Sequence, residues 1–264
     1  MSGKRINFFS IFWGVLALLY FFLPIYGTLD FSLRMERGII GFKAYQIVFS
    51  DPRFWQAFRY STIMAAITIV ISVSIFVPTV YWMYLKVPQA RPIMETLTIL
   101  PFMIPGIILV FGFSRTFSGP PFQMTLHAFT TDILMVAGYI IVSMPYMFRA
   151  VDVGMRSIDV RTLTEAAQSL GSNWFEVLTD VIIPNLRIAI LSGSLICFAT
   201  VMGELILADF LFRPALGPYM VRIGLTKAYE PAALAIISYT LTWFSLGILQ
   251  IFSTRAAKRQ QIAN

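Results

Sequence analysis

Six stretches of the chain carry no Asp, Glu, Lys or Arg and are long enough, or nearly so, to cross a membrane. They are Ile6–Leu29, Tyr60–Leu85, Thr96–Ser114, Ile133–Phe148, Ile188–Gly203 and Pro231–Thr254. A helix needs about 20 residues to span roughly 30 Å of hydrocarbon. The fourth and fifth stretches are short, so we expect polar extensions through Thr130–Asp132 and Glu204–Asp209. The pattern predicts an all-α polytopic membrane protein with six transmembrane helices.

Composition agrees with a membrane protein. The chain is 58% hydrophobic and 12% charged, whereas a soluble domain carries about 25% charged residues. A net charge of +7 would suit nucleic acid, but the basic residues are scattered among helix ends, so we expect membrane lipid and no nucleic acid as a partner. The single Cys197 and the single His127 provide neither a disulfide nor a metal cluster. We therefore predict no catalytic and no metal-binding residues.

The ends of the chain indicate its orientation. Lys4 and Arg5 precede an apolar core that is longer than the 7–15 residues of a secretory signal, so we expect an uncleaved first helix. An even number of spans places both termini on one side. Basic residues near the first and last spans favour a cytoplasmic location for both termini, although the division between the two sides, 11 against 9, is a weak bias.

One polar, patterned segment interrupts the apolar runs between the fourth and fifth predicted spans. Thr162 and Glu165 have the spacing of a capping box. Leu163, Ala166, Ala167 and Leu170 then form one apolar stripe, and Gly171 stands where a left-handed residue ends a helix. Asn173 and Glu176 repeat the box spacing, and a second stripe runs to Pro184, which closes the unit: Trp174, Val177, Leu178, Val181 and Ile182. The segment predicts two short amphipathic helices joined at a glycine.

Three interpretations of this unit compete. It could pack on its own transmembrane bundle as a helical loop, lie on the lipid surface, or dock into a groove of another protein. Interfacial helices favour Lys and Arg on the polar face, whereas this unit carries Glu165, Glu176 and Asp180, so the lipid surface is disfavoured. Helices this short are marginal alone and must be held by packing.

The segment resembles the EAA signature of binding-protein-dependent ABC importer permeases. The matching residues are Glu165, Ala166, Ala167, Gly171 and the run from Val181 to Pro184, and "LPFMIPGIILV" in the third span is also similar. The usual Ile and Leu before the proline are Val181 and Ile183 here. The resemblance covers residues 55–254, the importer core, with residues 162–185 as the EAA coupling loop, within one permease domain of residues 1–264. The layout is similar to the spermidine/putrescine type, and it implies a type I importer fold.

The resemblance implies a mechanism and partners. The EAA loop would be a cytoplasmic helical coupling hairpin, seated in a groove of an ATPase subunit through Glu165, Ala166, Ala167, Gly171 and Pro184. The chain itself has no G-x-x-x-x-G-K-[ST] phosphate loop, so it needs no cofactor of its own, and ATP and Mg would be bound by the partner. The implied assembly is two ATPase subunits, a second permease subunit (a heterodimer favoured over a homodimer) and an extracytoplasmic substrate-binding protein, in a bacterial inner membrane.

The sequence indicates the residues of the transport path less clearly than those of the EAA loop. Glu204 and Asp209, in or at the end of the fifth span, are candidates because intramembrane acids mark substrate or ion paths. They could equally lie near the outer interface. Prolines 78, 101, 105 and 145 would bend or interrupt spans two to four. Tyr81, Trp82 and Tyr84 predict an interfacial aromatic belt.

The resemblance favours a polyamine as the solute. Ferric ion, an aminophosphonate or another small solute is the alternative. A secondary transporter would need paired repeats, and none is seen in the sequence. A membrane-embedded enzyme would need clustered catalytic groups, which one His and one Cys do not supply.

Overall fold

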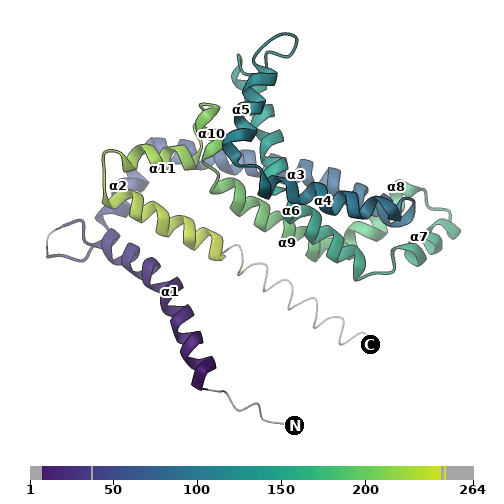
Figure 1. Cartoon of the computed structure of the whole chain (residues 1–264), viewed down its shortest axis with the longest axis horizontal. Coiled ribbons are helices and arrows are strands. Elements are labelled where there is room, and N and C mark those ends of the chain that lie inside the picture. Colours follow the sequence, from purple (N-terminus) through teal and green to yellow (C-terminus); the bar gives the residue numbers. More distant parts are fainter. Residues whose placement is uncertain (1–7, 37, 245–246, 248–264) are drawn as a thin grey trace. The chain divides into compact units, whose positions relative to one another are not determined.

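The computed structural model describes residues 8–36, 38–244 and 247, and these are almost entirely helical. The chain divides into two compact units. The first comprises the described residues up to Trp55 together with Tyr219–Leu241, and the second comprises Gln56–Pro218 and the described residues from Thr242 onwards. Figure 1 shows the course of the chain through these helices.

Four helices are long and apolar enough to cross a membrane, and a bent pair would make a fifth. The four are Ile11–Leu33 within α1 (Phe8–Leu33), α3 (Pro52–Leu85), α6 (Ala128–Arg156) and Trp174–Met202, which includes α9 (Ile183–Met202). They confirm the first, second, fourth and fifth predicted spans. For the sixth, residues 229–244 are helical, and most of residues 245–254 lie outside the described part of the chain.

The third predicted span is broken. It consists of α4 (Arg91–Met103), preceded by the 3-10 turn η1 (Pro88–Ala90), and α5 (Gly106–Phe117). The two helical segments meet at an angle of 98°. The residue before a proline is pushed toward extended backbone, and Ile104, which precedes Pro105, has φ −95° and ψ 115°. Pro105 therefore ends α4, as its position predicts, whereas Pro78, Pro101 and Pro145 lie within continuous helices.

Close packing of α6 against α9 forms the centre of the second unit. A Cβ on Gly154 of α6 would lie 2.5 Å from the Cβ of Ala189, and one on Gly193 of α9 would lie 2.9 Å from the sulfur of Met147. Small residues at a helix interface let two backbones approach closely, as is usual in membranes. Replacing either glycine by a larger residue would push these two helices apart.

The fifth predicted span ends earlier than expected. α9 stops at Met202, and Glu204 lies in the break before the short helix α10 (Ile206–Phe210). The extension through Glu204–Asp209 is therefore wrong. The Glu204 carboxylate accepts hydrogen bonds from the backbone N–H groups of Leu207 (2.9 Å) and Ala208 (3.3 Å), so it starts a new helix instead of continuing the old one. The chain then leads through residues 211–215 to α11 (Leu216–Gly224).

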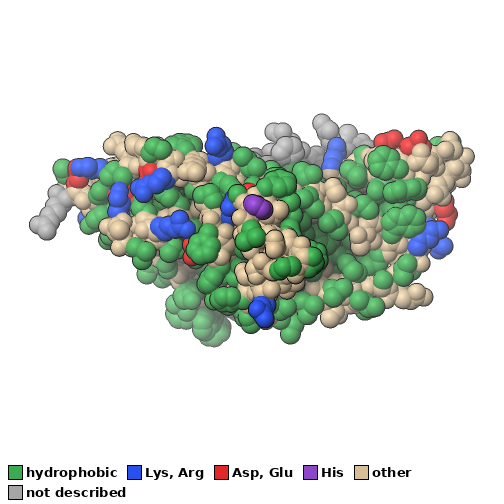
Figure 2. Space-filling view, turned by 90° about the horizontal axis from the view of Figure 1, so that it is seen from above, with side chains coloured by type: hydrophobic (Ala, Val, Ile, Leu, Met, Phe, Trp, Pro, Cys, Tyr) green, Lys and Arg blue, Asp and Glu red, His purple; other side chains and the backbone are tan. Residues whose placement is uncertain are grey.

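The first unit carries many exposed apolar side chains. Along α1, Phe9, Trp13, Leu16, Tyr20 and Phe21 are all about half or more exposed. Within this unit, α2 (Lys43–Ser50) lies close to α1, where the Ser32 and Tyr45 hydroxyls are 2.8 Å apart. Figure 2 shows a face of the molecule on which hydrophobic side chains predominate. Large exposed apolar surfaces mark contact with lipid or with another protein.

Candidate functional site

The polar segment folds as a helical hairpin, residues 159–182, at the ends of α6 and α9 (Figure 1). Its first helix, α7 (Val160–Ser169), has its N-cap three residues before the predicted cap Thr162. Asp159 is the N-cap: its carboxylate accepts the Thr162 N–H (3.1 Å) and the Thr162 hydroxyl (2.8 Å). The predicted capping box of Thr162 and Glu165 is therefore wrong. Glu165 instead pairs with Arg161 one turn before it, at 3.3 Å and largely exposed.

The Asp159 cap should make the start of α7 sensitive to acid. Hydrogen bonds from Thr162 hold the pKa of Asp159 below its ordinary value of 3.8. Because the pKa is lower in the folded hairpin than in the unfolded chain, the cap stabilises the helix fully above the ordinary pKa of 3.8. This stabilisation is lost as the pH falls from there through the lowered pKa of the folded state. We expect amide hydrogen exchange in residues 160–164 to accelerate on acidification below pH 3.8, measured by mass spectrometry after correction for intrinsic rates. Asp159→Asn, which caps without titrating, should remove this dependence; an unchanged dependence would exclude Asp159 as its source.

The turn between the two helices has the predicted glycine geometry. Gly171 has φ +93°. The Ser172 N–H donates to the Ala167 carbonyl (3.1 Å), and the Gly171 N–H donates to the Gln168 carbonyl (2.9 Å). These two bonds make a Schellman motif, in which a left-handed residue reverses the chain and satisfies the last helix carbonyls. The prediction for Gly171 is confirmed.

The second helix begins as predicted but does not end at Pro184. Asn173 and Glu176 form a capping box at α8 (Trp174–Glu176). The chain then continues through a π turn, η2 (Val177–Ile182), directly into α9, with Pro184 in its first turn. Pro184 removes one N–H from this continuous helix, and the π turn directly before it is a local irregularity in the helical hydrogen bonds. Pro184 therefore joins the hairpin to the fifth span rather than closing it.

One face of the hairpin packs on the bundle. Its buried residues are Val160, Thr164, Ala167, Val177, Leu178 and Ile182. The Thr164 hydroxyl lies 3.2 Å from that of Tyr81 in α3, and Tyr81 is only 1% exposed. The predicted interfacial belt is thus wrong for Tyr81, which is an internal contact of the hairpin.

The other face is apolar and exposed. Leu170 is 89% exposed, Phe175 58% and Trp174 49%, and Ala166 is exposed beside them. The predicted first stripe is therefore split: Ala167 is buried in the bundle and Leu163 half-buried, whereas Ala166 and Leu170 face outward. Leu170 precedes the Gly171 turn and Trp174 and Phe175 follow it, so the fixed backbone of the turn holds these side chains. We call Leu170, Trp174 and Phe175 the outer hairpin face.

Four charged residues between α4 and α6 form a cluster that the sequence did not single out. Asp152, whose side chain is 1% exposed, binds Arg156 (Oδ2 to Nη2, 2.5 Å) and lies 3.6 Å from Arg91. Glu95 binds Arg91 (3.1 Å) and Arg156 (3.4 Å). Each arginine thus contacts both acids, and we call the four residues the charge ring. Tyr84 of α3 donates to Asp152 at 3.0 Å. The only sequence signal was an oppositely charged pair four residues apart on each helix.

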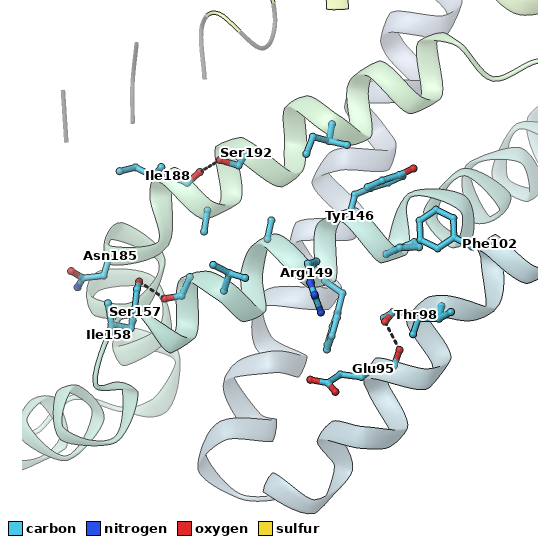
Figure 3. A pocket seen from close by; sticks show the side chains of 18 residues that line it. Glu95, Thr98, Phe102, Tyr146, Arg149, Ser157, Ile158, Asn185, Ile188 and Ser192 are labelled. Atoms are coloured by element: carbon cyan, nitrogen blue, oxygen red, sulfur yellow. Dashed lines mark hydrogen bonds between the residues drawn. The ribbon is translucent and has the colours of Figure 1, made fainter. Parts of the chain in front are cut away.

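A cavity of about 980 Å³ lies between α4, α6 and α9. Figure 3 shows its lining, with Arg149 of α6 in the space facing α4. Its polar lining residues are Glu95, Thr98, Tyr146, Arg149, Ser157, Asn185 and Ser192. Within the described part of the chain no salt bridge to Arg149 is formed, while Glu95 is held by the charge ring. A cavity of this size is large enough for a small solute.

The two acids predicted for the transport path do not line this cavity. Glu204 is half-buried and caps α10, and Asp209 is half-buried on α10. α10 itself packs near the break in the third span, where a Cβ on Gly106 would lie 3.4 Å from Ile206. Glu204 and Asp209 therefore lie outside the cavity lining, in the break after α9 and in α10.

A further ion pair lies at the ends of α3 and α6 remote from the hairpin. Arg213 binds Asp132 at 2.7 Å, and its guanidinium also donates to the Tyr60 hydroxyl at 3.1 Å. Tyr60 in turn donates to Asp132. Arg213, in the segment that follows α10, is thus bound to both α3 and α6. Among the described residues, no group of three or more His, Cys, Asp or Glu side chains is placed to hold a metal ion.

Comparison with known proteins agrees with this architecture. The permease protein PotB of the spermidine/putrescine transport system of Haemophilus influenzae is 27% identical over 173 residues, which are 61% of this chain and 60% of that protein, less than two thirds of its length. PotC of the same kind of system in Escherichia coli strain K12 is 24% identical over 84% of this chain and 85% of its own. Relatives named for sulfate and ferric transport match at 23% and 26% identity, so these matches do not select one solute.

The fold also has a solved counterpart. A chain of a bacterial ABC transporter involved in the import of the acidic polysaccharide alginate superimposes with a TM-score of 0.66 at 16% identity, covering 90% of this chain and 92% of that one. Such identity shows the fold alone. The family described as "Binding-protein-dependent transport system inner membrane component" matches residues 88–259. The chain belongs to this family and is a multi-pass inner membrane permease subunit of an ABC importer.

Proposed function

We propose that this permease is driven by an ATPase subunit that grips the outer hairpin face. The observation that supports this most is an exposed apolar group, Leu170, Trp174 and Phe175, on a backbone fixed by caps and by the Gly171 turn. An apolar helix face that is held rigid suits a groove in another protein. Glu165, Ala166 and Ala167 lie on the helix that enters the turn, and Pro184 joins the second helix to the fifth span.

The proposed assembly follows from this docking. The hairpin and both termini face the cytoplasm, where two ATPase subunits bind ATP and Mg, and a second, different permease subunit completes the path. An extracytoplasmic binding protein delivers the solute; a solved alginate transporter bound to its periplasmic protein contains a chain of this fold. Closure of the ATPases would move the hairpin, and the long helices joined to it, as rigid bodies.

A polyamine is the proposed solute, supported by the names of two relatives and by the acids Glu204 and Asp209 near the broken helices. One observation favours the alternative of an anionic solute such as an aminophosphonate. Among the described residues none forms an ion pair with Arg149 in this cavity, whereas the cavity's acid, Glu95, is paired with two arginines. A guanidinium binds carboxylate and phosphate groups, so a polyamine route would need acids from the second permease subunit. Ferric ion would need the same.

Reconstituted transport distinguishes these solutes. The complete transporter with its binding protein, in proteoliposomes, should take up labelled spermidine only with ATP, and unlabelled putrescine should compete. Glu204→Gln should lower this uptake at limiting solute while assembly is unchanged, because the path would lose an acid. ATP-dependent uptake of an aminophosphonate in place of spermidine, lowered by Arg149→Gln and not by Glu204→Gln, would replace the polyamine with the anionic alternative.

A further inference from the structure

The charge ring stands between the hairpin and the broken third span. α6 ends at Arg156, and Asp159, the cap of the first hairpin helix, follows three residues later. Across the ring, Arg91 and Glu95 lie in the first two turns of α4. Each ring residue contacts partners on both its own helix and the other one. The ring is therefore the polar tie that joins the base of the hairpin to α4.

We propose that the charge ring is the joint through which movement of the hairpin reaches α4, and that Glu95 and Arg156 are positioning residues for coupled transport. This rests on the proposed docking of an ATPase on the hairpin. α4 is separated from α5 by the 98° break at Ile104–Pro105, so α5 does not hold α4 in line. The movement of α4 is then decided by its contacts with α6. The ring supplies charged contacts between the first turns of α4 and α6.

The geometry suits a stiff joint. Asp152 is buried, and its two carboxylate oxygens are held by different residues: Oδ1 accepts from the Tyr84 hydroxyl and Oδ2 from two nitrogens of Arg156. Asp152 is shielded from water, so its charged hydrogen bonds are strong and directional, whereas the Arg91, Glu95 and Arg156 side chains are 33%, 41% and 47% exposed. The two acids and two bases alternate, so each charge has opposite charges beside it. By contrast, an ordinary apolar contact would allow α4 to slide on α6.

The joint also reaches the cavity. Glu95 belongs both to the ring and to the cavity lining, and Figure 3 shows it on α4 across from the α6 side chains. If α4 follows α6 through the ring, the α4 wall of the cavity moves with the hairpin. If the ring is weakened, the hairpin can move with the ATPase while the wall lags behind. The expected defect is therefore uncoupling, with ATP hydrolysed and little solute moved.

The test is Glu95→Gln in the complete transporter. The Glu95 side chain is 41% exposed, so its loss leaves the buried Asp152 with its partners. The ratio of solute imported to ATP hydrolysed should fall about fivefold or more, by analogy with the lower end of coupling between two binding sites, while the ATPase still copurifies. Glu95→Asp, which keeps the charge, should recover most of this ratio. Glu36→Gln is the matched control, since Glu36 is 45% exposed and pairs with a basic residue outside the ring, Lys43; its ratio should equal the parental one.

Every result of this experiment either supports the proposal or overturns it. A parental ratio for Glu95→Gln would show that the ring only supports the fold, and would overturn the proposal. So would loss of ATPase binding in Glu95→Gln alone, because the ring would then act on docking rather than on transmission. Failure of the parental chain to copurify any ATPase would instead refute the proposed function on which the joint rests.

Discussion

Gly171→Val should abolish transport while every transmembrane helix still inserts. Gly171 has φ +93°, and a residue with a Cβ pays roughly 1–2 kcal/mol to adopt the left-handed conformation, more when it is β-branched. A Cβ there meets nothing within 4 Å, so the effect comes from the backbone and not from a clash. The Schellman turn would open, and the second helix would leave the first at a different angle. Both sides of the outer hairpin face could then no longer meet one groove.

Two matched variants isolate this cause. Gly171→Asn should stay near the parental rate, because asparagine tolerates the left-handed conformation. Gly119→Val adds the same side chain at a loop glycine with open space around it and without a positive φ, and should also transport normally. The measurement is ATP-dependent uptake into proteoliposomes together with copurified ATPase. Parental uptake by Gly171→Val would mean that the turn has no role in coupling.

The local signals of the hairpin were readable from the sequence. The Gly171 turn and the box of Asn173 and Glu176 act through groups three to five residues apart, so their spacing alone predicts the geometry. The long apolar runs were equally informative, since a membrane requires helices of a minimum length. Both kinds of prediction depend on short-range rules, which is why they agree with the structure.

The misplaced helix start shows where local rules fail. Asp159 and Thr162 can both act as caps, and each is followed by a plausible first turn. In the structure Asp159 is the cap that accepts the Thr162 N–H, and Val160, the first residue of the helix, is buried. Pro184 was misjudged for a related reason. A proline usually ends a helix, but here it occupies the first turn of α9 after a π turn.

Contacts between residues far apart in the chain could not be predicted from the sequence. Glu95 and Arg156 are 61 residues apart, and Tyr60 and Arg213 are 153 apart. In the sequence their charges looked like topology signals at helix ends. Only the packing of α4 on α6, and of the segment after α10 on α3, brings them together. A bend or interruption of the third span was predicted from its prolines, but the 98° angle was not, because a proline alone does not set the angle.

The second large effect is expected at Leu170. Its side chain is 89% exposed on the outer hairpin face, so replacing it should change the fold little. Leu170→Lys also places a favourable charge at a helix C-terminus. In the assembled transporter, however, it would lose the burial of one leucine, about 1.5–3 kcal/mol, and put a cation into an apolar groove. We expect at least a ten- to hundredfold weaker complex with the ATPase, roughly the factor that this energy implies.

Copurification of the ATPase with the tagged permease tests the central claim most directly. The parental chain should retain the ATPase through detergent solubilisation, and Leu170→Lys should lose most of it. Leu225→Lys is the matched control, because Leu225 is 81% exposed and follows α11 in the other unit; it should retain the ATPase fully. Full retention by Leu170→Lys, or equal loss by both variants, would contradict docking on the outer hairpin face.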